Sequence, residues 1–178
     1  DTLKLAGEIP DTAGVHGIAI ASDLGRGFTS NGRTSSSTIF DLTTLKPVGE
    51  VKTGENPDMI LYEPRSHRVL AFNARSKDVT VIDAKGGTVA GTIALEGKPE
   101  LAVPDDKATV FVNLEDKSEV LALDPVALKV RGRWSLAPCE EPTGLAIDRA
   151  HRRLFAACDN KMMAVMDADS GKVVATIP

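Results

Sequence analysis

Apolar residues fall in short runs, separated by turn-forming residues, along the whole chain. Between residues 56 and 97 the runs are 58–63, 68–73, 79–83 and 89–95. Each run has five to seven residues, is rich in apolar or β-branched types, and lacks the 3.6-residue periodicity of an amphipathic helix. The segments between them have the length and composition of hairpin turns. The pattern therefore predicts short antiparallel β-strands and no helix longer than one turn.

This set of four runs repeats at a nearly constant interval. An Asp closes the third run of every unit, at spacings of 42, 41 and 43 residues: Asp41, Asp83, Asp124 and Asp167. A Pro opens the first run of three units, at spacings of 42 and 43 residues: Pro57, Pro99 and Pro142. In the first unit His16, which lies 41 residues before Pro57, is expected to replace this Pro. Two independent anchors thus indicate one period.

Four antiparallel strands in a unit of this length are typical of a β-propeller blade. We therefore predict an all-β chain of four blades, at about residues 15–54, 56–97, 98–139 and 140–178. Residues 4–10 match residues 172–178, the fourth strand of the last blade, so residues 2–10 are expected to form the orphan outer strand of a preceding blade. The chain is then an arc of a longer propeller, and its two ends expose strand edges and apolar faces.

The repeated Asp is predicted to have a structural role. A carboxylate at the end of a strand can accept hydrogen bonds from the backbone N–H groups of the following turn. Gly87 and Gly171 can supply the positive φ that such a turn needs. We expect none of the four Asp residues to be catalytic.

Composition limits the classes of function. The 178 residues are 42% hydrophobic and carry a formal net charge of −4, which suits a globular domain and argues against nucleic acid as a partner. No run approaches the roughly 18 consecutive apolar residues of a membrane-spanning helix. The sequence starts at Asp1 without a signal-peptide pattern, so we expect a processed or excised chain.

One phrase recurs in each unit: an apolar strand that ends in Asn, a short loop, and a strand that ends in Asp. The copies are FTSNGRTSSSTIFD (28–41), LAFNARSKDVTVID (70–83), VFVNLEDKSEVLALD (110–124) and FAACDNKMMAVMD (155–167). The last copy has Cys158 where the second has Asn73. The chain resembles the YVTN-type β-propeller repeat proteins of bacterial and archaeal surface layers and periplasms. The resemblance implies a seven-bladed parent, an exported (periplasmic or secreted) bacterial protein, and further blades or a second copy that cover the open ends.

Candidate binding residues gather at one end of the predicted blades. The first strand begins where the second ends, so the segment around each Pro and the loop after each Asn should share one rim of the central channel. Arg33 and Arg75 are equivalent loop residues, and Asp58 and Glu100 each follow a Pro. Guanidinium groups beside carboxylates can hold a polar or zwitterionic small molecule. The predicted ligand contacts are Arg33, Arg75, Asp58, Glu100, His16, Asn31, Asn73 and Glu115.

A second interpretation of these residues stays open. Polar side chains are common at loop tips because they are solvated, and Asn at a strand end is often a turn former. His16 has no partner His or Cys in register, which favours a hydrogen-bonded rim residue over a metal ligand. His67 and His151 are expected at turns of the opposite rim.

The leading hypothesis is a non-enzymatic binding or scaffold propeller that takes a polar ligand or a protein partner and needs neither metal nor other cofactor. The sequence contains no GxSxG, HExxH or phosphate-cradling glycine motif. The alternative is an enzyme module, lactonase-like or a metal- or quinone-dependent oxidoreductase, with its site at the channel mouth. That alternative follows from the fold class alone.

The two cysteines are predicted to form a disulfide. Cys139 precedes the first strand of the last blade, and Cys158 ends the second strand, so the hairpin brings them together. A disulfide implies an oxidising compartment such as the periplasm or the exterior. Two free thiols packed as small apolar groups, or a soft-metal pair, are the alternatives.

Overall fold

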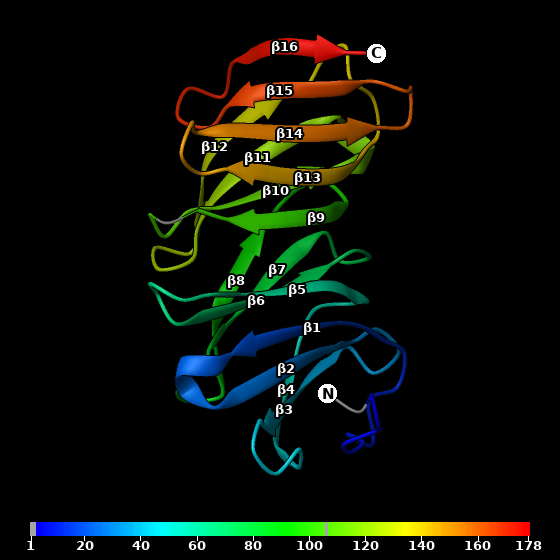
Figure 1. Cartoon of the computed structure of the whole chain (residues 1–178), viewed down its shortest axis with the longest axis vertical. Coiled ribbons are helices and arrows are strands. Elements are labelled where there is room, and N and C mark those ends of the chain that lie inside the picture. Colours follow the sequence, from blue (N-terminus) through cyan, green and yellow to red (C-terminus); the bar gives the residue numbers. More distant parts are fainter. Residues whose placement is uncertain (1–2, 106) are drawn as a thin grey trace.

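The computed structural model describes residues 3–105 and 107–178 as four antiparallel sheets of four strands each (Figure 1). The first sheet holds β1 (Val15–Ala21), β2 (Arg26–Asn31), β3 (Ser36–Asp41) and β4 (Pro47–Lys52). The second holds β5 (Pro57–Glu63), β6 (Arg68–Asn73), β7 (Asp78–Asp83) and β8 (Thr88–Ala94). The third holds β9 (Pro99–Pro104), β10 (Val110–Leu114), β11 (Glu119–Asp124) and β12 (Lys129–Ser135). The fourth holds β13 (Pro142–Asp148), β14 (Arg153–Cys158), β15 (Met163–Asp167) and β16 (Val173–Ile177).

Helical structure in the described ranges is limited to two 3-10 turns of three residues, η1 (Ser22–Leu24) and η2 (Glu115–Lys117). The all-β prediction, with four blades and no helix beyond one turn, is therefore confirmed. Every sheet lies within one of the four predicted repeat units. Among the helices of the described residues, none has the length and apolar character needed to cross a membrane.

The sheets follow one another in series, from β1–β4 at one end to β13–β16 at the other (Figure 1). The first strands of neighbouring sheets contact each other, in the pairs β1–β5, β5–β9 and β9–β13, whereas the fourth strands of neighbouring sheets barely touch. The sheets thus converge on their first strands and splay apart at their fourth, as blades do around an axis. The first strand of each sheet is its inner strand.

The middle blades are apolar on both faces. Leu70 and Phe72 of β6 lie in the hydrophobic cluster shared with the third sheet. Val69 and Ala71, the alternate residues, lie in the cluster shared with the first sheet. All four are fully buried, because successive side chains of a strand point to opposite faces and each face has a neighbour. A third cluster joins the third sheet to the fourth in the same way.

The fourth sheet has this pattern on both faces and no neighbour beyond it among the described residues. Leu154 and Ala156 of β14 pack against the third sheet, so Phe155 and Ala157 point the other way. Phe155 is half-buried, Ala157 is exposed, and Ile177 of the outer strand β16 is 46% exposed. The last blade therefore shows an apolar face of the kind that the middle blades bury.

Residues 3–14 form no strand. Gly7 nevertheless lies directly against Leu45 of the β3–β4 turn, just as Gly91 of the outer strand β8 lies against Leu128 of the next blade. The segment thus takes a position equivalent to that of an outer strand. Its pairing as the outer strand of a preceding blade stays a prediction, since the strands of that blade are not among these 178 residues.

The repeated Asp residues make the turns that the sequence predicts. Asp41 Oδ1 accepts hydrogen bonds from the backbone N–H groups of Thr44 (2.7 Å) and Thr43 (3.0 Å), and Asp167 Oδ1 accepts one from Ser170 (2.9 Å). The Thr44 bond lowers the pKa of Asp41 from its ordinary value, and the Ser170 bonds lower the pKa of Asp167 to about 2. The structural role is therefore confirmed for these turns.

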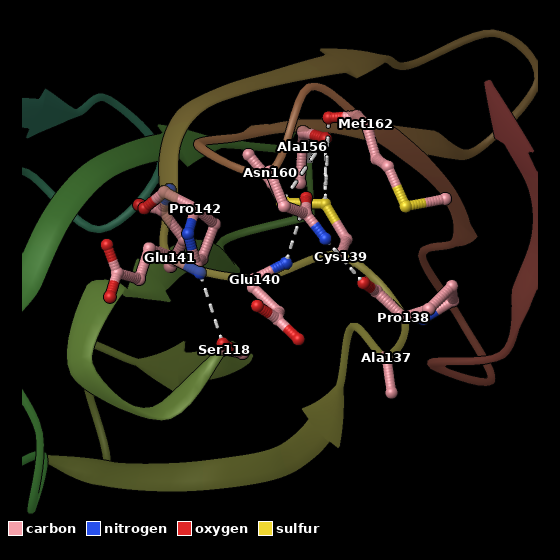
Figure 2. Close-up of a disulfide and its surroundings, with 12 residues drawn as sticks. Ser118, Ala137, Pro138, Cys139, Glu140, Glu141, Pro142, Ala156, Asn160 and Met162 are labelled. Atoms are coloured by element: carbon pink, nitrogen blue, oxygen red, sulfur yellow. Dashed lines mark hydrogen bonds between the residues drawn. A yellow bond between two sulfur atoms is a disulfide. The ribbon is translucent and has the colours of Figure 1, made fainter. Parts of the chain in front are cut away.

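Cys139 and Cys158 form a disulfide with a Cα–Cα distance of 5.6 Å (Figure 2). It joins the segment that enters the last blade to the end of β14, opposite Pro142. Asn160 reinforces this link, because its Nδ2 donates to the carbonyl of Pro138 (2.8 Å) and its Oδ1 accepts from Glu140 N (3.3 Å). The disulfide prediction is confirmed, and the free-thiol and soft-metal alternatives are wrong.

We expect no reactive thiol in the unfolded, unreduced protein and two after reduction. The double variant Cys139→Ala, Cys158→Ala should lower the free energy of unfolding by about 3 kcal/mol, because the bridge closes a loop of roughly 20 residues in the unfolded chain. Denaturant unfolding of the oxidised protein and the variant measures the difference. Two reactive thiols before reduction would contradict the disulfide.

Acid should destabilise the chain partly through Asp167. Its pKa is lower in the folded protein than its ordinary value, so its stabilising effect is present above about pH 4 and is lost as the pH falls toward 2. Asp167→Asn keeps an acceptor oxygen for the turn but does not titrate, so the fall in unfolding temperature between pH 4 and 2 should be shallower. Asp11→Asn, at an exposed residue outside the sheets, is the control and should leave the profile unchanged.

Candidate functional site

The start of each inner strand and the loop after the second strand lie on one rim. Pro57 pairs with Asn73, so Asp58 and the β6–β7 turn with Arg75 are at the same end of the second blade. The first blade has the same arrangement, since Val15 pairs with Asn31. The structure thus places four of the predicted residues on one rim: Arg33, Arg75, Asp58 and Glu100. His67 and His151 lie at the other ends of β6 and β14, on the opposite rim. Their part in ligand binding stays a prediction.

The register corrects the position assigned to His16. Val15, not His16, faces Asn31 in the way that Pro57 faces Asn73. His16 is therefore the second residue of its inner strand and is equivalent to Asp58. The sequence count was one residue out because the first blade has no Pro to mark the slot. The second positions of three consecutive inner strands thus carry His16, Asp58 and Glu100.

A hollow of about 590 Å³ opens on this rim between the first two blades, and we call it the rim hollow. Its wall includes His16, Arg33, Ser35, Glu55, Asn56 and Arg75. Arg33 and Arg75 are exposed, and within the described chain neither guanidinium group has a hydrogen-bond or ion-pair partner. Several other arginines are paired, such as Arg68 with Asp83 and Arg153 with Asp167. Two unpaired guanidinium groups therefore line one cavity.

The backbone presents these two arginines in the same way. Arg33 N donates to the carbonyl of Ala13 (3.3 Å), and Arg75 N donates to the carbonyl of Glu55 (3.2 Å). In each case the acceptor belongs to the segment that enters the blade. Gly14 and Asn56, the next residues of those segments, both have positive φ, of 67° and 55°. The repeat thus fixes both loops against the strands behind them and leaves the side chains to project over the hollow.

His16 links the rim hollow to a second hollow. Its Nδ1 lies 3.1 Å from Asp58 Oδ1 across the junction of the first two blades. The other ring nitrogen, Nε2, lies against Gly32, where an added Cβ would be 3.0 Å from it. The imidazole is therefore oriented by a carboxylate on one side and faces the rim hollow on the other. Such a pair can hold or release one proton at Nε2.

The second hollow has a volume of about 310 Å³ and runs along the inner strands β1, β5 and β9; we call it the channel hollow. It is lined by the polar side chains His16, Asp58 and Glu100 and by the apolar side chains Ile18, Met59, Ile60 and Leu101. Of these, Ile18 is 57% exposed and Leu101 is 36% exposed, although both are large hydrophobic residues. The channel hollow thus combines carboxylates with an exposed apolar wall.

Glu100 belongs to a small charged group. Lys98 Nζ lies 3.2 Å from Glu100 Oε1 and also binds Glu115. Burial raises the pKa of Glu100, Lys98 opposes the rise, and the neighbouring Glu115 adds to it. The hydrogen bond to Glu115 is the main cause of the raised pKa of Lys98. Two carboxylates thus share one ammonium group beside the channel hollow.

Asn31 and Asn73 are both fully buried. Asn31 Nδ2 donates to Thr38 Oγ1 (2.9 Å), and Asn73 Nδ2 donates to Thr80 Oγ1 (3.0 Å). Both side chains therefore join the second strand of a blade to its third. Their burial and these bonds indicate a structural role for both side chains, and their part in ligand binding stays a prediction.

Sequence reasoning missed Asn56, Glu55 and Lys98. Asn56 and Gly14 are 42 residues apart and just before their inner strands, so the repeat itself could have identified this position. Lys98 directly precedes Pro99, but the equivalent residue of the second blade, Asn56, is not basic. The repeat therefore gives no signal for Lys98. Across the described residues, no three His, Cys, Asp or Glu side chains are arranged to hold a metal ion.

Comparison with known proteins identifies a fold and no family. No protein-family model and no curated protein sequence matches the chain. The chain is similar to the structure described as Kuenenia stuttgartiensis hydrazine synthase, with a TM-score of 0.84 and 22% identity over 97% of this chain and 52% of that one. It is also similar to dihydro-heme d1 dehydrogenase NirN in complex with DHE (TM-score 0.78, 16% identity, 93% of this chain and 38% of that one). A third similar structure is BamB from Moraxella catarrhalis (TM-score 0.75, 15% identity, 91% of this chain and 49% of that one).

These likenesses show that the chain has a β-propeller fold. The chain spans 52%, 38% and 49% of the three structures, so it corresponds to about half of such a protein or less. At 15–22% identity, they carry no substrate or partner over to this chain.

Gly14→Ala should disturb the loop that carries Arg33. Gly14 has a φ of +67°, and an added Cβ would lie 2.7 Å from Arg33 Cγ and 3.1 Å from Arg33 N. The positive φ alone should cost about 1–2 kcal/mol of folding free energy for a non-glycine residue. Gly25→Ala is a matched control, because Gly25 has a φ of +63° and open space around its Cα. Denaturant unfolding should show a larger loss for Gly14→Ala, and equal losses would contradict the close contact with Arg33.

Proposed function

We propose that this chain is part of an exported β-propeller that binds a small polar ligand at the rim of its channel without chemically altering it. The observation that carries the proposal is the pair Arg33 and Arg75, which come from equivalent loops of adjacent blades and line one hollow without partners in the described chain. Two guanidinium groups in one cavity suit a carboxylate, phosphate or other anionic group, which each can bind through two parallel N–H donors.

The balance of charge on the wall supports an anionic group in the rim hollow. Among the described residues of the wall, Glu55 is the acidic one, and its charge offsets one of the two arginines. The wall therefore keeps one formal positive charge. Neighbouring guanidinium groups repel each other, and an anion between them removes this repulsion. His16 adds a nitrogen, Nε2, that can donate or accept a hydrogen bond according to its protonation.

Export is supported by the disulfide and by the resemblance to YVTN-type repeat proteins. The disulfide is maintained in an oxidising compartment, such as the periplasm or the exterior. That resemblance also favours further blades, or a second copy of the chain, as the cover of the apolar face of the last sheet. Seven blades in the parent protein are part of the same proposal.

An enzyme module is the second candidate, favoured by His16 and Asp58. A carboxylate-oriented imidazole that faces a cavity is a common acid–base device. Two of the similar structures are described as a synthase and a dehydrogenase. In this alternative the chain contributes to a lactonase-like or a metal- or quinone-dependent site at the channel mouth.

The test is binding of small anions by titration calorimetry, with inorganic phosphate, sulfate, acetate and succinate as probes. We expect at least one probe to bind the wild-type chain, and the double variant Arg33→Gln, Arg75→Gln to lose at least about tenfold in affinity, or about 1.4 kcal/mol. Arg65→Gln is the matched control, because Arg65 is an exposed arginine in the β5–β6 turn on the opposite rim.

Binding that is equal in the wild type and the double variant would remove the arginine pair from the proposal. Loss of binding in Arg65→Gln as well would indicate a general effect of charge rather than a site. Conversion of a bound ligand into a product, with loss of turnover in His16→Gln, would favour the enzyme alternative.

A further inference from the structure

The rim hollow and the channel hollow have opposite charge and share a wall. His16 lines both of them. The rim hollow presents Arg33 and Arg75, whereas the channel hollow presents Asp58 and Glu100. A single elongated molecule can therefore reach from one set of charges to the other by passing His16.

The carboxylates of the channel hollow lack full compensation. The ammonium group of Lys98 pairs with the carboxylates of both Glu100 and Glu115. These three side chains together therefore keep one formal negative charge. Within the described ranges, the side chain of Asp58 is paired with the imidazole of His16, at 3.1 Å. The rise in the pKa of Glu100, caused by burial and increased by Glu115, has the same physical origin, because negative charge is concentrated where water is limited. A cation placed there would relieve this repulsion.

The channel hollow also has an apolar wall that the carboxylates alone do not explain. Ile18, Met59 and Leu101 line it, and Ile18 is 57% exposed. Exposed apolar surface that is bordered by a few convergent polar groups is typical of small-molecule sites. Contact with methylene groups would remove this surface from water, which favours binding.

We propose that the ligand is an organic zwitterion with an apolar segment between its charged ends. Its anionic group binds Arg33 and Arg75, its apolar segment passes His16 and lies against Ile18 and Leu101, and its ammonium group binds Asp58 and Glu100. This inference rests on the proposed function, since it uses the same pair of arginines.

A ligand with a single charge would compensate the charges of only one of the two hollows. A simple anion would leave the carboxylates of the channel hollow uncompensated. A simple cation would leave Arg33 and Arg75 without a partner and would lie near them. A zwitterion places a compensating charge at both ends.

The experiment measures affinity for three probe series of matched length by titration calorimetry. The series are linear ω-amino acids, the corresponding n-alkanoates, and the corresponding n-alkylammonium ions, each with roughly four to eight carbons. At one length at least, we expect the amino acid to bind about tenfold or more tightly than the alkanoate and the alkylammonium ion of that length. If no length shows this gain, the zwitterion inference is wrong.

Variants separate this inference from the function on which it rests. Glu100→Gln keeps a carbonyl acceptor for Lys98 and leaves Asp58 in place. It should therefore reduce the affinity for the amino acid toward that for the alkanoate, while the affinity for the alkanoate stays the same. Arg33→Gln, Arg75→Gln should weaken both. Glu140→Gln, at an exposed glutamate that precedes β13 on the same rim and lines neither hollow, should change neither.

The outcomes are distinct. Arginine-dependent binding of the alkanoate, with no gain from the ammonium group, would overturn the zwitterion and leave the proposed function standing. If no probe binds in a way that depends on the two arginines, both the zwitterion inference and the proposed function are wrong. Because the comparison among probes uses the wild-type chain, it decides the zwitterion question even if a variant does not fold.

Discussion

Each blade must have a neighbour on both faces, and the rest of the structure depends on this constraint. Alternate residues of β6 face opposite sheets, and all of Val69, Leu70, Ala71 and Phe72 are fully buried. Burial of one such large side chain contributes about 1.5–3 kcal/mol, so a blade that lacked one neighbour would lose several such contributions. Exposure of one face to water is therefore unfavourable for a sheet with two apolar faces, whereas many antiparallel sheets have a polar second face that is solvated. The arrangement of the blades in series and the exposed apolar face of the last blade are both consequences of having two apolar faces on each sheet.

The same constraint builds the candidate site. Because the blades converge on their inner strands, loops that are about 42 residues apart in sequence meet at the axis. Arg33 and Arg75 illustrate this, since each backbone N–H donates to the segment that enters its own blade and each side chain reaches the same hollow. The rim residues contribute little to the buried clusters. Their identity can therefore change from blade to blade, as His16, Asp58 and Glu100 do, without cost to the packing behind them.

The sequence predicts those features that depend on local periodicity. Strands, turns and the disulfide follow from the spacing of apolar residues, the repeated Asp and the two cysteines, because each depends on residues within one hairpin. The position of His16 was missed by one residue, since the first blade has no Pro to mark the start of its inner strand. The shared pairing of Lys98 with Glu100 and Glu115 was also missed, because it depends on how two loops approach each other rather than on the period.

The end of the second strand shows why a repeated residue need not repeat its role. In the second blade, Asn73 and the entering residue Gly54 both donate to Thr80 Oγ1, so the strand is tied to the entering segment through a hydroxyl. In the third blade Leu114 occupies this position, because it pairs with Pro99. Asn113 lies one residue earlier, and its Nδ2 donates to the carbonyl of Pro142 (2.8 Å), which ties that blade to the next. In the fourth blade, Cys158 occupies the slot and bonds covalently to Cys139 in its entering segment. The residue at this position thus differs from blade to blade, and the covalent link lies in the blade whose far face has no cover among the described residues. The disulfide therefore holds the inner hairpin of that blade in place where packing supports it from one side only.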